Sequence, residues 1–283
     1  MARYDYTAQL EGAERFVDRP DGTRLRTVSV GNGGRTVVLA HGYGATADEW
    51  NLVAPLLAEQ GVRVVAFDQR GHGRSSIGSN GIGSMQMASD YGAILDAYDV
   101  VDGVLVGHSM GGFLALAFLL DDQSTATQRV SSLFLMATFA GNVNRKNPQN
   151  RLQIPLIQSG ILLRLLGIGA IARAFTKSLV GDGFEPEISN AFTTQFRVSD
   201  HSKLVPILRA LVEEDRYDRL GELRLPCTII VGTKDKTTPP FHTADLHAGI
   251  VDSKLVSIAG KGHLLNWEAP KEVAQEIGLL AAT

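Results

Sequence analysis

The sequence has little of what would indicate a disulfide scaffold, a nucleic-acid partner or membrane insertion. Its 283 residues include a single cysteine, Cys227, so no internal disulfide can form, and the strand-like residues around it predict a buried thiol. The net charge of -3 at pH 7 gives no electrostatic footprint for nucleic acid or anionic membranes. The first ten residues lack the apolar run of a signal peptide, and polar side chains interrupt the apolar stretch 154–175. We therefore expect a cytoplasmic protein without stable membrane insertion.

Histidines in a metal-binding arrangement are also lacking. His242 and His247 are five residues apart and miss the i, i+4 spacing that places two ligands on one helix face. We therefore expect neither a metal nor another cofactor. We expect His41, His72 and His108 to be structural. We expect His201, in the middle of the chain, to be solvated.

The clearest motif is G-x-S-x-G at residues 107–111, with Ser109 at its centre. The largely apolar stretch 101–106 predicts a buried strand before it, and 111–120 predicts a helix after it. A serine between such elements indicates a nucleophile elbow, whose glycines leave room for the neighbouring backbone. The following helix would direct its N-terminal amides at an oxyanion beside Ser109. The alternative is a glycine-rich turn in which the serine only caps the helix.

Strand-like and helix-like stretches alternate along much of the chain. An Asp-Gly turn at 21–22 predicts an antiparallel hairpin over 16–30, and Thr46-x-x-Glu49 predicts a capping box that opens a helix. Further strands are predicted at 36–40, 62–67, 130–136, 225–231 and 254–258, and further helices at 84–98 and 270–281. This alternation predicts an α/β fold with a mostly parallel sheet covered by helices on both faces.

The alternation breaks between Gly141 and about Leu220. Helical pieces are predicted there at 152–166, 168–179, 186–197 and 203–214. A helical insertion within an α/β pattern predicts a cap over the carboxyl ends of the strands. We therefore predict a core in two parts, 1–140 and 221–283, and a helical cap at 141–220.

Four glycine-containing segments follow predicted strands, where open α/β sheets place their ligand sites. These segments are 41–44, 107–112, 232–236 and 260–263. They bring Ser109, Asp235 and His263 to one edge, in the chain order of α/β-hydrolases. A serine hydroxyl needs a base, a histidine suits that task at neutral pH, and a carboxylate fixes the histidine tautomer. Asp68 also ends a predicted strand and is the alternative acid.

The chain resembles the serine α/β-hydrolases of the esterase, lipase and C–C-hydrolase group. The resemblance covers essentially the whole predicted core and rests on residues 41–44, 68–75, 107–112, 232–235 and 262–263. It implies an eight-stranded-type sheet, with Ser109 as nucleophile, Asp235 as acid and His263 as base. The backbone amides of Tyr43 and Met110 would form the oxyanion hole. In that family the aspartate–arginine turn at 68–75 is structural, which favours Asp235 as the acid.

The predicted cap holds the only evidence on the substrate, because its apolar residues are too many for one amphipathic stripe. We expect Leu162 and Leu166 to contact an apolar acyl chain, as in a carboxylesterase or monoacylglycerol lipase; the alternative is that they only pack. Arg164 and Arg173 would instead suit a carboxylate-bearing substrate of a C–C hydrolase or lactonase. By the same resemblance, His108 favours an esterase, because the C–C hydrolases of aromatic degradation have a similar motif with Asn at this position. A non-hydrolytic receptor and a cofactor-free lyase or perhydrolase on the same fold stay open.

Overall fold

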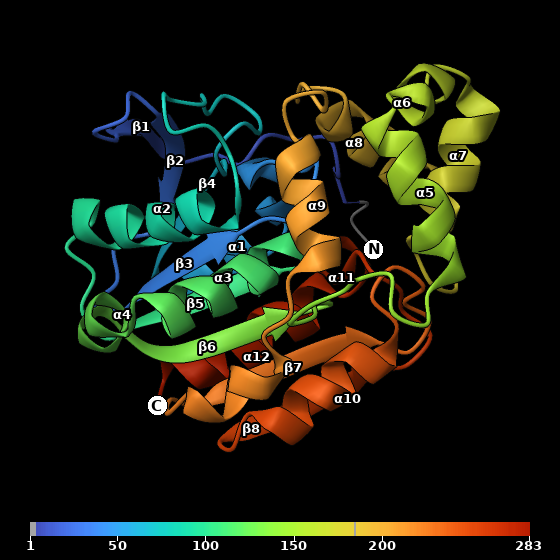
Figure 1. The fold of residues 1–283 in the computed structure, drawn as a ribbon. Coiled ribbons are helices and arrows are strands. Elements are labelled where there is room, and N and C mark those ends of the chain that lie inside the picture. The colour runs from blue at the N-terminus through green and yellow to red at the C-terminus, as the bar shows by residue number, and fades with distance from the viewer. Residues whose placement is uncertain (1–3, 184) are drawn as a thin grey trace.

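A computed structural model describes residues 4–183 and 185–283, with the backbone alone at Thr127. Its strands form one eight-stranded sheet in the order β1-β2-β4-β3-β5-β6-β7-β8 (Figure 1). β2 runs antiparallel to both β1 and β4, and all other neighbouring strands are parallel. The strands are β1 (Ala13–Asp18), β2 (Arg24–Val30), β3 (Thr36–Ala40), β4 (Arg63–Phe67), β5 (Gly103–His108), β6 (Val130–Met136), β7 (Cys227–Gly232) and β8 (Ser253–Ile258). The predicted α/β sheet is confirmed, including the hairpin β1–β2.

Helices cover both faces of the sheet, because the central strands are apolar on both sides. Every residue of β3 is buried, and alternate side chains enter different cores. Val38 packs in the core that includes α2 and α3, whereas Val37 and Leu39 pack with α1 and α12. The helices around the sheet are α1 (Ala54–Glu59), α2 (Ser84–Ala97), α3 (Met110–Asp121), α4 (Gln123–Arg129), α10 (Pro240–Gly249), α11 (Leu265–Glu268) and α12 (Pro270–Ala281), with the 3-10 helices η1 (Ala47–Trp50) and η2 (Tyr217–Glu222).

Among the described residues, five α-helices lie between β6 and η2, in the stretch where we predicted a helical insertion. They are α5 (Pro148–Gln158), α6 (Ile161–Leu165), α7 (Gly169–Lys177), α8 (Pro186–Phe196) and α9 (Val205–Glu213). Figure 1 shows α5–α8 grouped beyond the carboxyl ends of the strands. The predicted continuous helix over 152–166 is wrong. The chain turns at Gly160, whose φ of 71° lies in the left-handed region that glycine adopts readily, and this separates α5 from α6.

The predicted capping box at Thr46 is only half correct. Thr46 Oγ1 accepts a hydrogen bond from the amide of Asp48, but this opens the short η1 and not one continuous helix. The Glu49 side chain does not return to Thr46. It is buried and points to the candidate site described below. Cys227 is buried as predicted, and burial raises the pKa of its thiol.

None of the helices within residues 4–183 and 185–283 is both long and apolar enough to cross a lipid bilayer.

Candidate active site

Ser109 lies at the sharp turn between β5 and α3. Its φ of 52° and ψ of -117° are outside the regions that a side chain with a Cβ ordinarily adopts. The turn is held by the Ser109 amide, which donates to Met136 O at 3.0 Å, and by Thr138 Oγ1, which donates to Ser109 O at 2.6 Å. A Cβ on Gly107 would lie 2.4 Å from the Cα of Gly112, so this position needs glycine. The geometry is that of the predicted elbow, in which the strained serine stands clear of the strand.

Asp235 and His263 come from the loops after β7 and β8, and their side chains meet. His263 Nδ1 lies 2.9 Å from Asp235 Oδ2, and both residues are buried. The other carboxylate oxygen, Oδ1, accepts from the amides of Thr237 and Thr238 at 2.8 and 2.9 Å. Since the carboxylate only accepts, the Nδ1–H of His263 donates to it and Nε2 is left free to take a proton.

The loop after β3 carries Tyr43, whose amide we predicted to be an oxyanion donor. Tyr43 and Ser109 line the same pocket, and Met110 is the first residue of α3. Within the described part of the chain, neither the Tyr43 amide nor the Met110 amide has a recorded protein acceptor. A tetrahedral oxyanion formed at Ser109 would require two such amide donors.

A buried Glu49–His108 pair, which sequence reasoning did not find, joins three loops of the site. His108 Nδ1 lies 3.1 and 3.2 Å from the two carboxylate oxygens of Glu49, and its Nε2 lies 3.1 Å from His263 O. Glu49 Oε1 also accepts from the amide of Gly42, next to Tyr43. The 41–44 loop, named the oxyanion loop after its predicted role, is thereby connected to the elbow and to the loop that carries His263.

The charge state of His108 follows from these partners. Both ring nitrogens face acceptors, a carboxylate and a carbonyl, so the ring donates on both sides. Burial alone would lower the pKa of His108, but the Glu49 carboxylate outweighs it and the pKa is raised. The arrangement is that of an imidazolium, whose ring centroid lies 4.9 Å from that of His263. Glu49 was noted in the sequence, but its place three residues after Thr46 fits a helix-capping role equally well.

His201 is not solvated, so that prediction is wrong. The ring is 1% exposed and packs on Phe196 with centroids 4.2 Å apart. Its Nε2 lies 2.5 Å from Phe196 O, so Nδ1 is the acceptor for the Tyr43 hydroxyl at 2.9 Å. Burial lowers the pKa of His201, consistent with a neutral ring. This contact ties the helical insertion to the oxyanion loop.

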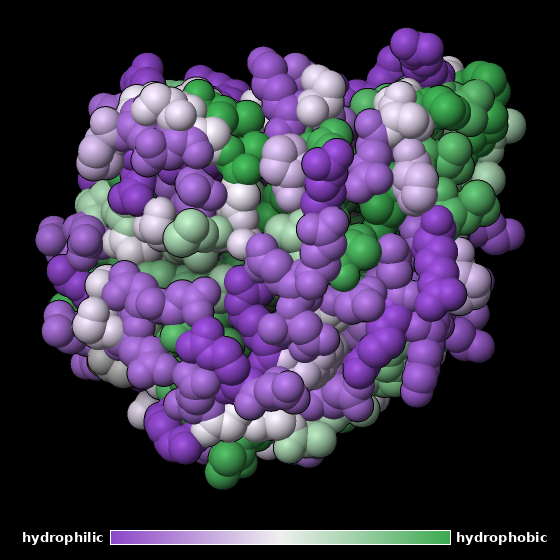
Figure 2. All heavy atoms as spheres, viewed as in Figure 1, coloured by the Kyte–Doolittle hydropathy of each residue, from purple (hydrophilic) through white to green (hydrophobic). Residues whose placement is uncertain are grey.

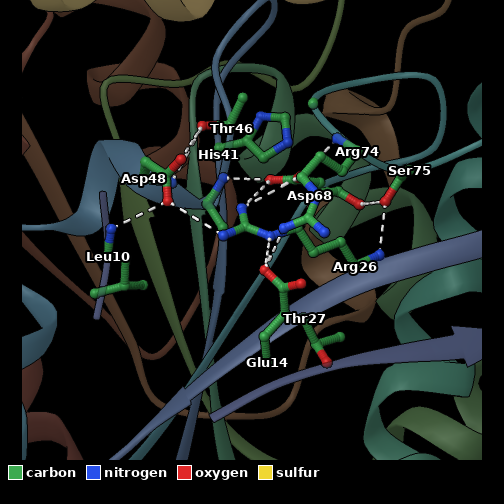
Figure 3. A network of polar contacts seen from close by, with 12 residues as sticks. Leu10, Glu14, Arg26, Thr27, His41, Thr46, Asp48, Asp68, Arg74 and Ser75 are labelled. Carbon is green, nitrogen blue, oxygen red and sulfur yellow. Dashed lines mark hydrogen bonds and ion pairs between the residues drawn. The ribbon is translucent and has the colours of Figure 1, made fainter. Parts of the chain in front are cut away.

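Asp68, the alternative acid, belongs to a different network (Figure 3). Its carboxylate accepts from the amides of Ala47 and Arg74 at 2.7 and 2.8 Å, and Arg26 lies 3.5 Å away. These contacts hold the 68–75 turn against η1 and β2. No hydrogen bond to His263 is recorded for Asp68 among the described residues, whereas Asp235 makes one directly.

Ser109, His263, Glu49 and His108 line a pocket with an empty volume of about 750 Å³. The remaining wall is mostly apolar and comes largely from the helical insertion. It includes Ile154, Ile157, Phe175, Phe192, Leu208 and Leu211. No arginine or lysine is among the residues that line this pocket.

Four predicted substrate contacts lie elsewhere. Leu162 and Leu166 are buried, but they are not among the pocket's lining residues, so their contact with an acyl chain stays a prediction. Arg164 and Arg173 are exposed and are not part of the lining either. The side chains that the structure offers to a substrate are therefore those of Ile154, Ile157 and their neighbours, which the sequence did not distinguish.

Among the described residues there is no group of three or more histidine, cysteine or acidic side chains arranged to hold a metal ion.

Comparison with known proteins agrees with the fold. A family model described as an alpha/beta hydrolase family matches residues 37–276. The chain belongs to the alpha/beta hydrolase family. This α/β-hydrolase is 30% identical over 279 residues to a 2-hydroxy-6-oxononadienedioate/2-hydroxy-6-oxononatrienedioate hydrolase of Klebsiella pneumoniae, covering 93% of this chain and 94% of that protein. A protein of the same name from Paraburkholderia xenovorans is 30% identical over 259 residues, or 87% and 86% of the two chains.

Solved structures of α/β-hydrolases share the architecture. An esterase from Exiguobacterium antarcticum superposes with a TM-score of 0.83 at 22% identity, covering 96% of this chain and 100% of that one. An enol-lactonase from Burkholderia xenovorans LB400 gives a TM-score of 0.78 at 20% identity, with 93% and 98% covered. At such identities the likeness establishes the fold, and the substrate has to be argued from the site itself.

Proposed function

We propose that this α/β-hydrolase is a serine hydrolase that cleaves a carboxylic ester with an apolar acyl chain through an acyl-enzyme. The observation that carries the proposal is the pocket: Ser109 and His263 line it together with a mostly apolar wall, and no arginine or lysine is among the lining residues. Serine at the elbow suits acyl transfer, whereas an aspartate there would suggest an alkyl-enzyme.

In the proposed first step, Ser109 Oγ attacks the ester carbonyl while His263 Nε2 takes the hydroxyl proton. Asp235, 2.9 Å from Nδ1, holds the ring in the required tautomer and stabilises the imidazolium that forms. The amides of Tyr43 and Met110 receive the negative charge on the carbonyl oxygen. Collapse of the tetrahedral intermediate expels the alcohol, which takes the proton from His263.

The second step repeats the first with water as the nucleophile. His263 removes a proton from the water, the resulting hydroxide attacks the acyl-enzyme, and the carboxylic acid leaves as Ser109 recovers its proton. In this scheme the Glu49–His108 pair takes part in neither of the proton transfers to His263. It positions the Gly42–Tyr43 loop relative to the main chain of His263, because Glu49 accepts from Gly42 and His108 donates to His263 O.

The names of the relatives favour a second candidate, a C–C hydrolase. Those names specify dioates, which carry two carboxyl groups, and these proteins are 30% identical to this chain. A dianion bound in an apolar pocket needs charged or multiple polar partners. The cap arginines that we considered for this task, Arg164 and Arg173, are exposed and outside the lining. The composition of the wall therefore favours the ester.

A direct competition between the two substrate classes tests the proposal. The purified protein would be given a p-nitrophenyl ester of a medium-length fatty acid and, separately, a 2-hydroxy-6-oxo-dienedioate. We expect kcat/KM to be higher for the ester by at least about 100-fold, since an unpaired buried carboxylate costs several kcal/mol. A higher kcat/KM for the dienedioate would replace the ester assignment by C–C bond hydrolysis.

A further inference from the structure

The first half of the helical insertion carries a net positive charge, unlike the rest of the chain. Residues 141–181 contain six basic side chains and no acidic one, whereas the rest of the chain has 21 basic and 30 acidic residues. The net charge of -3 for the whole chain does not reveal this asymmetry. The six are Arg145, Lys146, Arg151, Arg164, Arg173 and Lys177.

Most of these cations form no ion pair within the described part of the chain. Arg145 forms an ion pair with Asp245 of α10. Among the described residues, no carboxylate lies within ion-pair distance of Arg151, Arg164 or Arg173, and all three side chains are exposed. A group of unpaired cations on one set of helices creates a local positive potential that the acidic remainder of the surface lacks.

Large apolar side chains are exposed on the same helices. Leu152, Ile161 and Ile168 are 67%, 45% and 53% exposed. Figure 2 shows hydrophobic residues gathered at the upper right, over α6 and α7. The substrate pocket does not explain them, because α5 and α7 line it with other side chains, Ile154 and Phe175 among them. Exposed apolar residues that are grouped in this way mark an interaction surface.

We propose that the outer surface of α5–α7, defined by Leu152, Ile161, Ile168, Arg164 and Arg173, binds peripherally to an anionic phospholipid bilayer. Apolar side chains that enter the interface beside unpaired cations are the pattern of surface-bound amphipathic helices. Anionic headgroups supply the charges that these arginines lack within the protein. The proposal concerns binding and does not require the ester activity, although it would bring the pocket close to lipophilic esters.

A second copy of this chain fits the same surface poorly. In a two-fold dimer each surface would face its own copy, and the arginines of one molecule would lie opposite those of the other. Residues 141–181 hold no carboxylate that would offset this repulsion. A bilayer with negative headgroups has the opposite sign and no such penalty.

Sedimentation with vesicles tests the proposal without any turnover. The full chain would be mixed with phosphatidylcholine vesicles, either pure or with about 30% phosphatidylglycerol, at low and high salt. We expect binding to the anionic vesicles only, weakened by salt. Ser109→Ala should bind equally well, so a failure of the ester assignment and a failure of docking are distinguishable.

Paired variants separate the two parts of the surface. The doubles Ile161→Ser with Ile168→Ser, and Arg164→Gln with Arg173→Gln, should each weaken binding at least about tenfold. Val251→Ser is the matched control, because Val251 is an apolar side chain 82% exposed on a different part of the molecule. Absence of binding, equal binding to neutral vesicles, or loss in the control as well would overturn the proposal. So would a dimer in sedimentation velocity that only the Ile161→Ser with Ile168→Ser double dissociates.

Discussion

The carboxyl edge of the sheet and the helices α5–α9 contribute to the same pocket in different ways. The edge supplies polar groups, each fixed by several hydrogen bonds, such as Asp235 with its two amide donors and Ser109 with its strained backbone. The helices supply mainly apolar side chains that define a volume. A reaction needs its charged groups in one geometry, whereas an acyl chain needs only space and apolar contact. Substitutions at the edge are therefore expected to lower the rate of reaction, and substitutions in the helices are expected to change the selectivity for the acyl chain.

The largest effect is expected from Ser109→Ala. Loss of the nucleophile should lower kcat on the preferred ester by about 10⁴-fold or more, because no other group can form the acyl-enzyme. The thermal unfolding midpoint should not decrease, since alanine removes only the hydroxyl from the strained turn. Activity assays and calorimetry on the same preparation measure both. Wild-type turnover in a folded variant would rule out the elbow serine as nucleophile.

The two candidate acids offer the next comparison. Asp235→Asn should lower kcat by about 10⁴-fold, because an asparagine opposite Nδ1 disfavours the required His263 tautomer. Asp68→Asn should lower the free energy of unfolding, since it removes a buried carboxylate that accepts from two amides and lies beside Arg26. Its kcat should change far less. The reverse pattern of kcat values would assign the acid to Asp68.

The Glu49–His108 pair should affect rate more than affinity. In Glu49→Gln the amide can still accept from Gly42 and donate to His108 Nδ1, but the ring loses its charge. We expect kcat to fall about tenfold with KM little changed, because the oxyanion loop is less firmly placed. The control is Asp90→Asn, which disturbs a buried pair with Arg70 outside the pocket lining and should lower stability only. Equal losses of kcat in both variants would mean that the Glu49 pair has no positioning role.

The Glu49→Gln variant also tests how the free energy of unfolding depends on pH. The folded state raises the pKa of His108 above its ordinary 6.5, so the charged ring stabilises the fold fully below that value. This stabilisation is lost as the pH rises through the higher folded-state pKa. The wild type should therefore exceed Glu49→Gln in free energy of unfolding by most at roughly pH 5 to 6.5, and by less in more alkaline buffer. Urea titrations across that range measure the difference, and a gap that widens with pH would contradict it.

The apolar wall should show smaller, substrate-dependent effects. Ile157→Thr places a hydroxyl in the pocket lining and should reduce kcat/KM for long acyl chains about five- to tenfold, with little change for acetate. Leu166→Thr is the matched control, because Leu166 is buried in the same group of helices but outside the lining. Chain-length profiles that change alike in both variants would mean that the wall does not contact the acyl chain.

The smallest effect is expected at Tyr43, where the carboxyl edge of the sheet contacts the helical insertion. Tyr43→Phe removes the hydroxyl that donates to His201, while the Tyr43 backbone amide stays in place. We expect a loss of about 1 kcal/mol in the free energy of unfolding and less than about a threefold change in kcat. A large loss of kcat would mean that the helical insertion holds the oxyanion loop in its active position.

The segments at the strand ends were predictable, because short motifs encode them and few backbone conformations satisfy each motif. G-x-S-x-G with Ser109 works only where glycines allow the close approach seen at Gly107. Asp235 and His263 were located by their positions after predicted strands and by the family resemblance. The strands over 36–40 and 130–136 were predicted residue for residue, because short, mostly apolar and β-branched stretches have few alternatives in a parallel sheet. Local patterns thus determine this part of the molecule.

The rest could not be read locally, because it depends on contacts between distant segments. Glu49 fits a capping box equally well, and only the approach of His108, 59 residues later, gives it another partner. His201 follows a charged residue and appears polar in sequence, yet its partner Tyr43 is 158 positions away. Which leucine or isoleucine of the insertion faces the pocket depends on how α5–α9 pack, and the break at Gly160 changes the face that Leu162 presents.

The most direct test of the central claim is the rate of hydrolysis of p-nitrophenyl esters from acetate to palmitate, with wild type and Ser109→Ala measured side by side. We predict turnover that peaks at an intermediate or long acyl chain and disappears in the variant. Absence of ester turnover in a folded wild type, or turnover that survives in Ser109→Ala, would contradict the assignment of a serine esterase with an apolar acyl pocket.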